Sequence, residues 1–183
     1  MKKKIYKTFC LVMVFTLLSS FQAFCYPQNA TMNYSNGFPS GYSTGIRMKY
    51  YQYGTMNWSS YVNDAVSKIN SCPANISLSN QSYYTYNQLQ IAVSSNYWEG
   101  GDWWGVAGEC EQITNDLYAQ KKVYLNSSYS TNMPNAVALH EFLHAFGIND
   151  CENVYSIAHG YALKYNYITS DVNSLLINRY GRR

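Results

Sequence analysis

Residues 138–150 read ALHEFLHAFGIND, and this stretch decides how the rest of the chain is interpreted. His140 and His144 are four residues apart, a spacing that places two side chains on the same face of a helix. Two imidazole nitrogens arranged in this way can reach one zinc ion at about 2.0–2.1 Å. Glu141 is rotated away from the ligand pair, so its carboxylate can accept a proton from water at the metal without binding the metal itself. The stretch therefore predicts a helical zinc site.

A zinc site usually takes a third protein ligand, and two residues are candidates for it. Asp150 lies three residues beyond Gly147, close enough for a reversal of the chain to return its carboxylate to the ion. The alternative is His159, since all three histidines of the chain fall in this region. We expect Asp150 to be the third ligand, with His159 as its competitor.

Residues 140–150 fit the pattern HExxHxxGxxD, which resembles the zinc motif of the metzincin clan in its snapalysin-like variant. The resemblance continues in Ser156-Ile157-Ala158-His159-Gly160-Tyr161, which is similar to the methionine turn of these enzymes, although Ala158 stands where the methionine belongs. The last stretch, YITSDVNSLLINRYG (167–181), looks like the C-terminal helix of matrixin catalytic domains. Together the likeness covers about residues 46–183.

This resemblance implies a zinc metalloendopeptidase of the matrixin type. His140, His144 and Asp150 would bind Zn²⁺, and Glu141 would be the general base that takes a proton from the attacking water. Gly147 would adopt a left-handed conformation that lets the chain turn sharply. An edge strand beside the cleft would pair with an extended peptide or protein substrate, and the expected strand is Trp103–Glu109. Whether the protein also holds a structural Ca²⁺ does not follow from the sequence.

The hydrophobic pattern predicts one α/β (α+β) domain of zincin-like fold, with a twisted mixed sheet of about five strands. A helix is expected from Ser59 or Ser60 to Cys72-Pro73, an active-site helix from Pro134 through Phe146, and a C-terminal helix from Asp171. Alternation or short apolar runs place the other strands at 46–51, 76–79, 88–94 and 122–126.

The N-terminus is typical of an exported protein. Lysines crowd residues 2–7, a mostly apolar run follows from Phe9 to Phe21, and small residues precede a cleavage position after Cys25. We therefore expect a signal peptide at 1–25, a flexible arm at 26–44 and the catalytic domain at 45–183. The apolar run is too short for a stable membrane anchor. An odd number of cysteines remains after cleavage, namely Cys72, Cys110 and Cys151, and their pairing is left open.

The composition limits the possible partners. A net charge of +3 with scattered lysines and arginines gives no dense basic patch, so nucleic-acid binding is not expected. We expect a secreted monomer that acts on peptide or protein substrates. The alternative is an exported binding or adhesion protein with a catalytically silent metzincin-like fold, a role that would suit the 20 tyrosines of the chain. Glu141 argues against this alternative because a binding module has no use for a general base.

Overall fold

A computed structural model of the protein describes residues 30–32, 37–41, 43–52, 56–81, 90–96, 108–112, 120–126, 131–161 and 163–183. The segment predicted as a signal peptide lies outside these residues. The strands are β1 (Ile46–Gln52), β2 (Leu78–Asn80), β3 (Gln90–Asn96), β4 (Gly108–Gln112) and β5 (Gln120–Asn126), and the helices are α2 (Ser59–Ser71), α3 (Pro134–Ala145) and α4 (Ser170–Tyr180).

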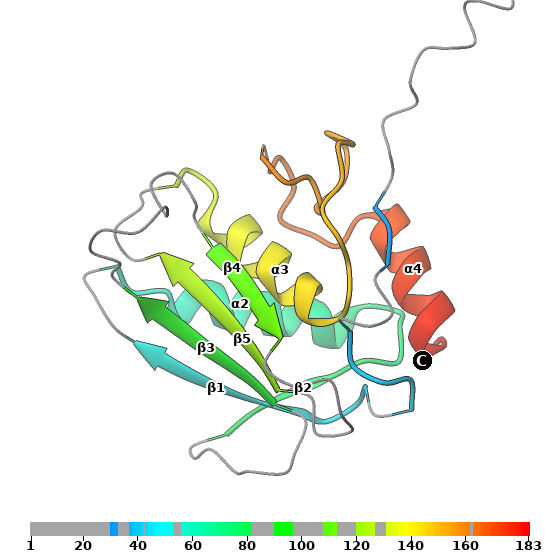
Figure 1. Cartoon of the computed structure of the whole chain (residues 1–183), viewed down its shortest axis with the longest axis horizontal. Coiled ribbons are helices and arrows are strands. Elements are labelled where there is room, and N and C mark those ends of the chain that lie inside the picture. The colour runs from blue at the N-terminus through cyan, green and yellow to red at the C-terminus, as the bar shows by residue number, and fades with distance from the viewer. Residues whose placement is uncertain are drawn as a thin grey trace, which may run out of the picture.

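The described strands form a mixed sheet in the order β2-β1-β3-β5-β4 (Figure 1). β1, β2, β3 and β5 run parallel, and β4 pairs antiparallel with β5, with Glu109 opposite Tyr124. The predicted strand Trp103–Glu109 overlaps β4 only at its last two residues, and 103–107 lie outside the described part of the chain. β4 is the last strand in this order, so the strand expected to bind substrate lies at the sheet edge.

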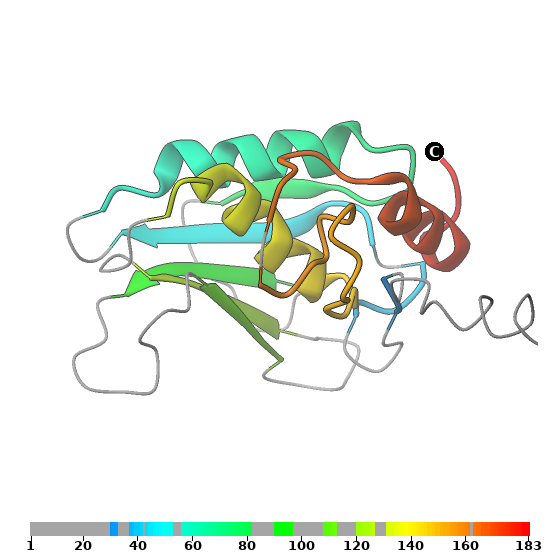
Figure 2. The ribbon, with the colours of Figure 1, turned by 90° about the horizontal axis from the view of Figure 1, so that it is seen from above.

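Both central helices lie on one face of the sheet, with α3 against β5 and β4 and α2 against α3, β1 and β2 (Figures 1 and 2). The predicted helix from Ser59 is confirmed, and it buries the apolar face Val62, Ala65, Val66 and Ile69. α3 is buried on almost every side, which places its polar residues inside the protein rather than on a solvated face.

Part of the described stretch within 26–44 is packed into the domain, although the sequence predicts a flexible arm there. Phe38 is fully buried, and its ring meets the ring of Phe146 edge to face at 5.5 Å. The hydroxyl of Tyr180 donates hydrogen bonds to the carbonyls of Phe38 (3.1 Å) and Phe146 (2.9 Å). A β-carbon on Gly37 would come within 2.6 Å of the Phe146 carbonyl oxygen, so the close approach requires glycine. This part of the segment therefore belongs to the core.

Two further features bear on the sequence-based expectations. Among the described helices, none is both long and apolar enough to span a membrane. Cys72 and Cys151 are buried free thiols, so they do not pair with each other. Their burial is typical of cysteines that act as small apolar core residues.

Candidate metal centre

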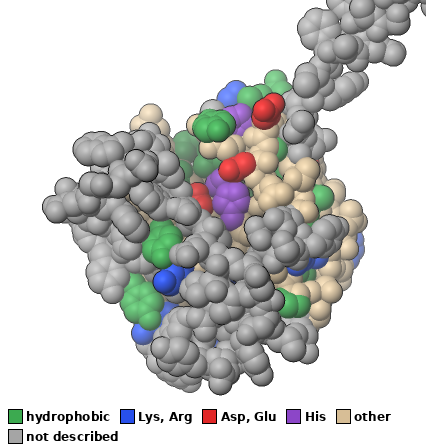
Figure 3. Space-filling view, in the orientation of Figure 1, with side chains coloured by type: hydrophobic (Ala, Val, Ile, Leu, Met, Phe, Trp, Pro, Cys, Tyr) green, Lys and Arg blue, Asp and Glu red, His purple; other side chains and the backbone are tan. Residues whose placement is uncertain are grey.

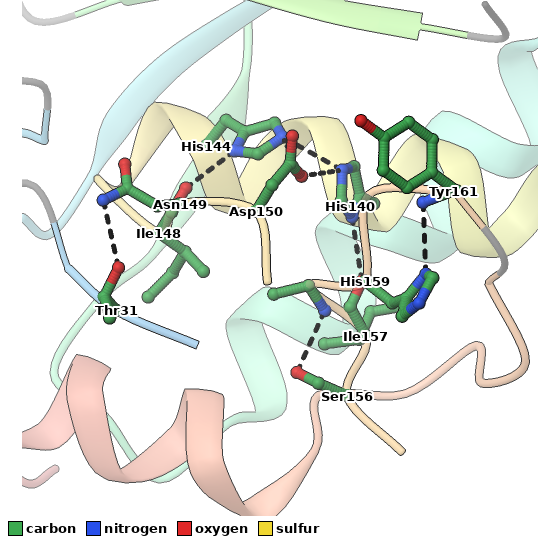
Figure 4. A network of polar contacts seen from close by, with 11 residues as sticks. Thr31, His140, His144, Ile148, Asn149, Asp150, Ser156, Ile157, His159 and Tyr161 are labelled. Atoms are coloured by element: carbon green, nitrogen blue, oxygen red, sulfur yellow. Dashed lines mark hydrogen bonds and ion pairs between the residues drawn. The ribbon is translucent and has the colours of Figure 1, made fainter. Parts of the chain in front are cut away.

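The site is built at the C-terminal end of α3 and the reversal that follows it. His140 and His144 stand one turn apart on α3, with their ring centroids 4.5 Å apart. Gly147 then adopts a φ of 90°, a conformation that favours glycine, and the chain turns back. This reversal brings Asp150 Oδ1 to 3.1 Å from His140 Nε2 and 3.4 Å from His144 Nε2 (Figure 4). Three side chains predicted from the sequence thus converge.

Backbone carbonyls fix the tautomer of both histidines. His140 Nδ1 lies 2.8 Å from the carbonyl oxygen of Ile157, and His144 Nδ1 lies 2.6 Å from that of Ile148. A carbonyl can only accept a hydrogen bond, so each Nδ1 carries the hydrogen. Both Nε2 atoms then present lone pairs to each other across 2.9 Å, beside a carboxylate oxygen. Such a group of electron-rich atoms is stable only with a cation among them.

The spacing of these atoms fits zinc. Four ligands arranged tetrahedrally about 2.05 Å from an ion lie about 3.3 Å from one another. The observed separations are 2.9, 3.1 and 3.4 Å, so an ion would need to open the group by only a few tenths of an ångström. Two imidazoles and one carboxylate are also a donor set that zinc accepts, with a fourth position left for water.

The pKa values of His144 and Asp150 describe the charge of the same site without metal. Burial alone would lower the pKa of His144, but the carboxylate of Asp150, the charge of Glu141 and the Ile148 carbonyl outweigh it and raise the pKa to about 9. The ion pairs with His140 and His144 hold the pKa of Asp150 well below its usual range. At neutral pH a proton therefore takes the place of the cation in the metal-free protein.

Glu141 lies beside this group. Its ligand atom and those of His140 and His144 all lie within 4.8 Å of one another, and the residue is 94% buried. The buried carboxylate of Glu141 therefore lies next to the two histidines that could hold a metal.

The turn beneath the site holds His159 differently from the two helical histidines. His159 Nδ1 accepts a hydrogen bond from the backbone N–H of Tyr161, and the residue forms a parallel bridge with Cys151. Among the described residues, His140, Glu141 and His144 form a group of possible metal ligands that includes neither His159 nor Asp150. Asp150 is distinguished from His159 by its Oδ1, which lies 3.1 and 3.4 Å from the two Nε2 atoms. Ala158 is buried in the same turn, at the position where the resembling enzymes carry a methionine.

Several supporting residues could not be recognised from the sequence. The carbonyls of Ile148 and Ile157 orient the histidines, yet any residue type can supply a carbonyl, so no sequence signal marks them. The hydroxyls of Ser156 and Thr169 accept N–H groups of the turn, and only the likeness to a methionine turn and a C-terminal helix drew attention to this part of the sequence. The space-filling view shows histidine side chains reaching the surface next to acidic ones (Figure 3), and the side chain of Asp150 is 61% exposed.

A mixed sheet covered on one face by two helices, with the His-Glu-x-x-His pair on the second of them, is the zincin-like arrangement predicted from the sequence. High choriolytic enzyme 1, a hatching-enzyme zinc-protease from the medaka fish Oryzias latipes, is similar in structure, with a TM-score of 0.53 and 13% identity over 85% of this chain and 100% of that one. Myroilysin is similar with a TM-score of 0.51 and 16% identity over 84% of this chain and 99% of that one. No protein-family model matches the sequence, and no curated protein matches it significantly. At these identities the likeness bears on the fold alone, and it confirms the predicted zincin-like fold.

The raised pKa of His144 predicts how the stability of the metal-free protein changes with pH. Because the folded-state pKa, about 9, lies above the ordinary value of 6.5, protonation of His144 stabilises the fold fully below pH 6.5. That contribution is lost as the pH rises from 6.5 through 9. Urea unfolding in the presence of a chelator should therefore give a free energy of unfolding that falls over this range. In Asp150→Asn the free energy of unfolding should fall less over this range. An equal fall in both proteins would contradict the conclusion that Asp150 raises the pKa of His144.

Proposed function

We propose that this chain is a zinc-dependent endopeptidase. The observation that carries the proposal is the convergence of His140 Nε2, His144 Nε2 and Asp150 Oδ1 next to the buried carboxylate of Glu141. This is the set of groups that metal-assisted peptide hydrolysis requires: ligands that leave one position open, and a separate base. The zincin-like fold supports the same conclusion.

In this proposal His140, His144 and Asp150 hold the metal, and Glu141 carries out the proton transfers. Bound zinc would supply a Lewis acid that makes water more acidic and polarises the scissile carbonyl. Glu141 takes the proton of the attacking water and delivers it to the amine that leaves. Its burial keeps the carboxylate out of bulk solvent, which strengthens its interaction with the charge that develops during the reaction.

The substrate would bind as an extended peptide along β4. This strand ends the described sheet order and packs against α3, so a peptide added to its outer edge would run past the metal site. Main-chain hydrogen bonds to a sheet edge bind a peptide without regard to its side chains, and neighbouring pockets then select among sequences.

Export is the second part of the proposal, and it rests on the sequence of the first 25 residues. A basic start, a short apolar run and small residues before Tyr26 are what the secretory pathway recognises. Expressed with its native N-terminus in a secreting host, the protein should appear in the medium and begin near Tyr26, as N-terminal sequencing would show. Retention in the cell with Met1 intact would refute this part alone.

Replacement of Glu141 by Gln tests the reaction. The amide keeps the size of the side chain but cannot accept the proton, so proteolysis of casein should fall by about 10²–10⁴-fold while zinc content stays the same. A chelator should abolish the activity of the unsubstituted protein, and added zinc should restore it. If the unsubstituted protein binds zinc but cleaves nothing, the alternative of an exported binding protein is favoured instead.

Asp150→Ala and His159→Ala form a matched pair for the third ligand. We expect Asp150→Ala to weaken zinc binding by at least about 10–100-fold, the loss seen even when a residue behind a ligand is removed. His159→Ala should leave the affinity nearly unchanged, because its Nδ1 accepts the backbone N–H of Tyr161, whereas Asp150 Oδ1 lies beside both histidine Nε2 atoms. Zinc affinity measured by competition with a chromophoric chelator decides between them, and the reverse order would overturn the role of Asp150.

A further inference from the structure

A glycine in the turn beneath the site lies directly against the side chain of Asp150. If Gly160 carried a β-carbon, the three nearest atoms would all belong to Asp150, with Cγ at 3.3 Å, Cβ at 3.4 Å and Oδ2 at 3.5 Å. The shortest of these distances is tighter than β-carbons usually accept. Any side chain at position 160 would therefore press on the carboxylate that faces His140 and His144.

The backbone conformation of Gly160 does not itself require a glycine. Gly147 and Gly181 have a positive φ, but Gly160 does not, so residues with side chains can adopt its conformation. Gly160 is also exposed, so a larger residue would not have to be buried. The contact with Asp150 is the feature of this position that the missing side chain serves.

Hydrogen bonds hold the chain on both sides of Asp150. Before it, the N–H of Asn149 donates to the carbonyl of Thr31 at 2.9 Å, and the side-chain amide of Asn149 donates to Thr31 Oγ1 at 3.2 Å (Figure 4). After it, the carbonyl of Cys151 accepts the N–H of Gly160 at 3.3 Å. The main chain of Asp150 is therefore tied in place alongside Gly160, and its side chain is the part that would yield to a larger neighbour.

The side chain of Asp150 can yield only away from the histidines. Oδ1 already lies 3.1 Å from His140 Nε2 and 3.4 Å from His144 Nε2, so the carboxylate has no room to move closer to them. The side chain is 61% exposed, so the way toward solvent is open. A side chain at position 160 would therefore turn the third ligand out of the site.

We propose that Gly160 is a positioning residue for the metal centre, because its missing side chain leaves the space in which Asp150 meets the two histidines. The inference rests on the proposed zinc site, and it assigns a role to a residue outside the ligand set. A functional group must be held within about 0.5 Å of its productive position. The residues around metal ligands usually achieve this through hydrogen bonds, whereas Gly160 achieves it by leaving room.

Substitutions of increasing size at position 160 test this role. Gly160→Ala adds one carbon at the contact distance, and Gly160→Val adds two more beyond it. Gly181→Ala is the control, because φ at Gly181 is 82° and no described atom lies within 4 Å of the added β-carbon. This control strains the backbone and lowers stability without touching Asp150. All variants are compared in the full chain, with folding checked by circular dichroism.

Zinc affinity, measured with a chromophoric chelator, is the first readout. We expect Gly160→Ala to bind zinc more weakly than the unsubstituted protein, and Gly160→Val to lose about tenfold or more. Gly181→Ala should unfold more easily yet bind zinc like the unsubstituted protein. Unchanged affinity in Gly160→Val would overturn the proposal, and so would equal losses in Gly160→Val and Gly181→Ala. If Gly160→Val does not fold, Gly160→Ala takes its place in every comparison.

The second readout asks whether Gly160 acts through Asp150. In a protein that already carries Asp150→Ala the carboxylate is absent, so Gly160→Val should weaken zinc binding no further. A further loss in that protein would show that position 160 acts on the fold in general, and it would overturn the proposal. The visible absorption of the cobalt-loaded protein depends on the ligand set, so it should change alike in Gly160→Val and Asp150→Ala and stay unchanged in Gly181→Ala.

Neither readout depends on proteolysis, so failure of this inference can be told from failure of the proposed function. A protein that shows all these differences in metal binding but cleaves no substrate would refute the proposed function and leave the role of Gly160 intact. Zinc-dependent proteolysis by the unsubstituted protein, together with unchanged zinc affinity in Gly160→Val, would do the opposite.

Discussion

The metal centre of this protein is constrained by the mutual repulsion of three electron-rich atoms. Two imidazole lone pairs and a carboxylate oxygen lie within 3.4 Å of one another, and two carbonyls force the histidines to present those lone pairs inward. Without a cation such a group would push itself apart. In the metal-free protein a bound proton can hold the three atoms together, and this makes the site sensitive to pH. A divalent ion holds them better, since one ion interacts with all three atoms at once.

Segments distant in the sequence must fold correctly for those atoms to meet. The N-terminal segment pairs Met32 with Ile148, and Thr31 accepts the N–H of Asn149, on the two residues just before Asp150. At the other side, α4 supports the turn that holds His140. Metal binding should therefore stabilise the whole domain rather than the helix alone, because a ligand that binds only the folded state shifts the entire unfolding equilibrium.

The parts of the site that could be predicted are those encoded locally. The spacing of His140 and His144 specifies one face of a helix, and Gly147 marks where that helix ends, because only glycine adopts its conformation easily. The apolar faces of α2 and the alternation in β1 likewise follow from short-range periodicity. The zincin-like arrangement of the sheet and helices followed from these elements and from the likeness of the motif.

Contacts between distant segments could not be predicted from local sequence patterns. Nothing near Phe38 has a regular apolar period, so the segment was predicted as a flexible arm, although a single aromatic ring packed against Phe146 is enough to place its described part in the core. Thr169 Oγ1 joins the turn to the start of α4, because it accepts the N–H of Ile157 at 3.2 Å. A threonine just before a helix ordinarily indicates a cap, and only the structure shows that it supports the turn whose carbonyl orients His140.

The charge of the site has a consequence for its chemistry. With histidine as third ligand, the dication and Glu141 would leave one net positive charge, whereas Asp150 makes the sum zero. The extra negative charge would strengthen the hold on the ion and weaken its ability to acidify water, because a more electron-rich metal is a poorer Lewis acid. In the proposed mechanism Glu141 would then take a larger share of the proton transfer as the base. Its burial suits that role, since a desolvated carboxylate accepts a proton more readily than a hydrated one.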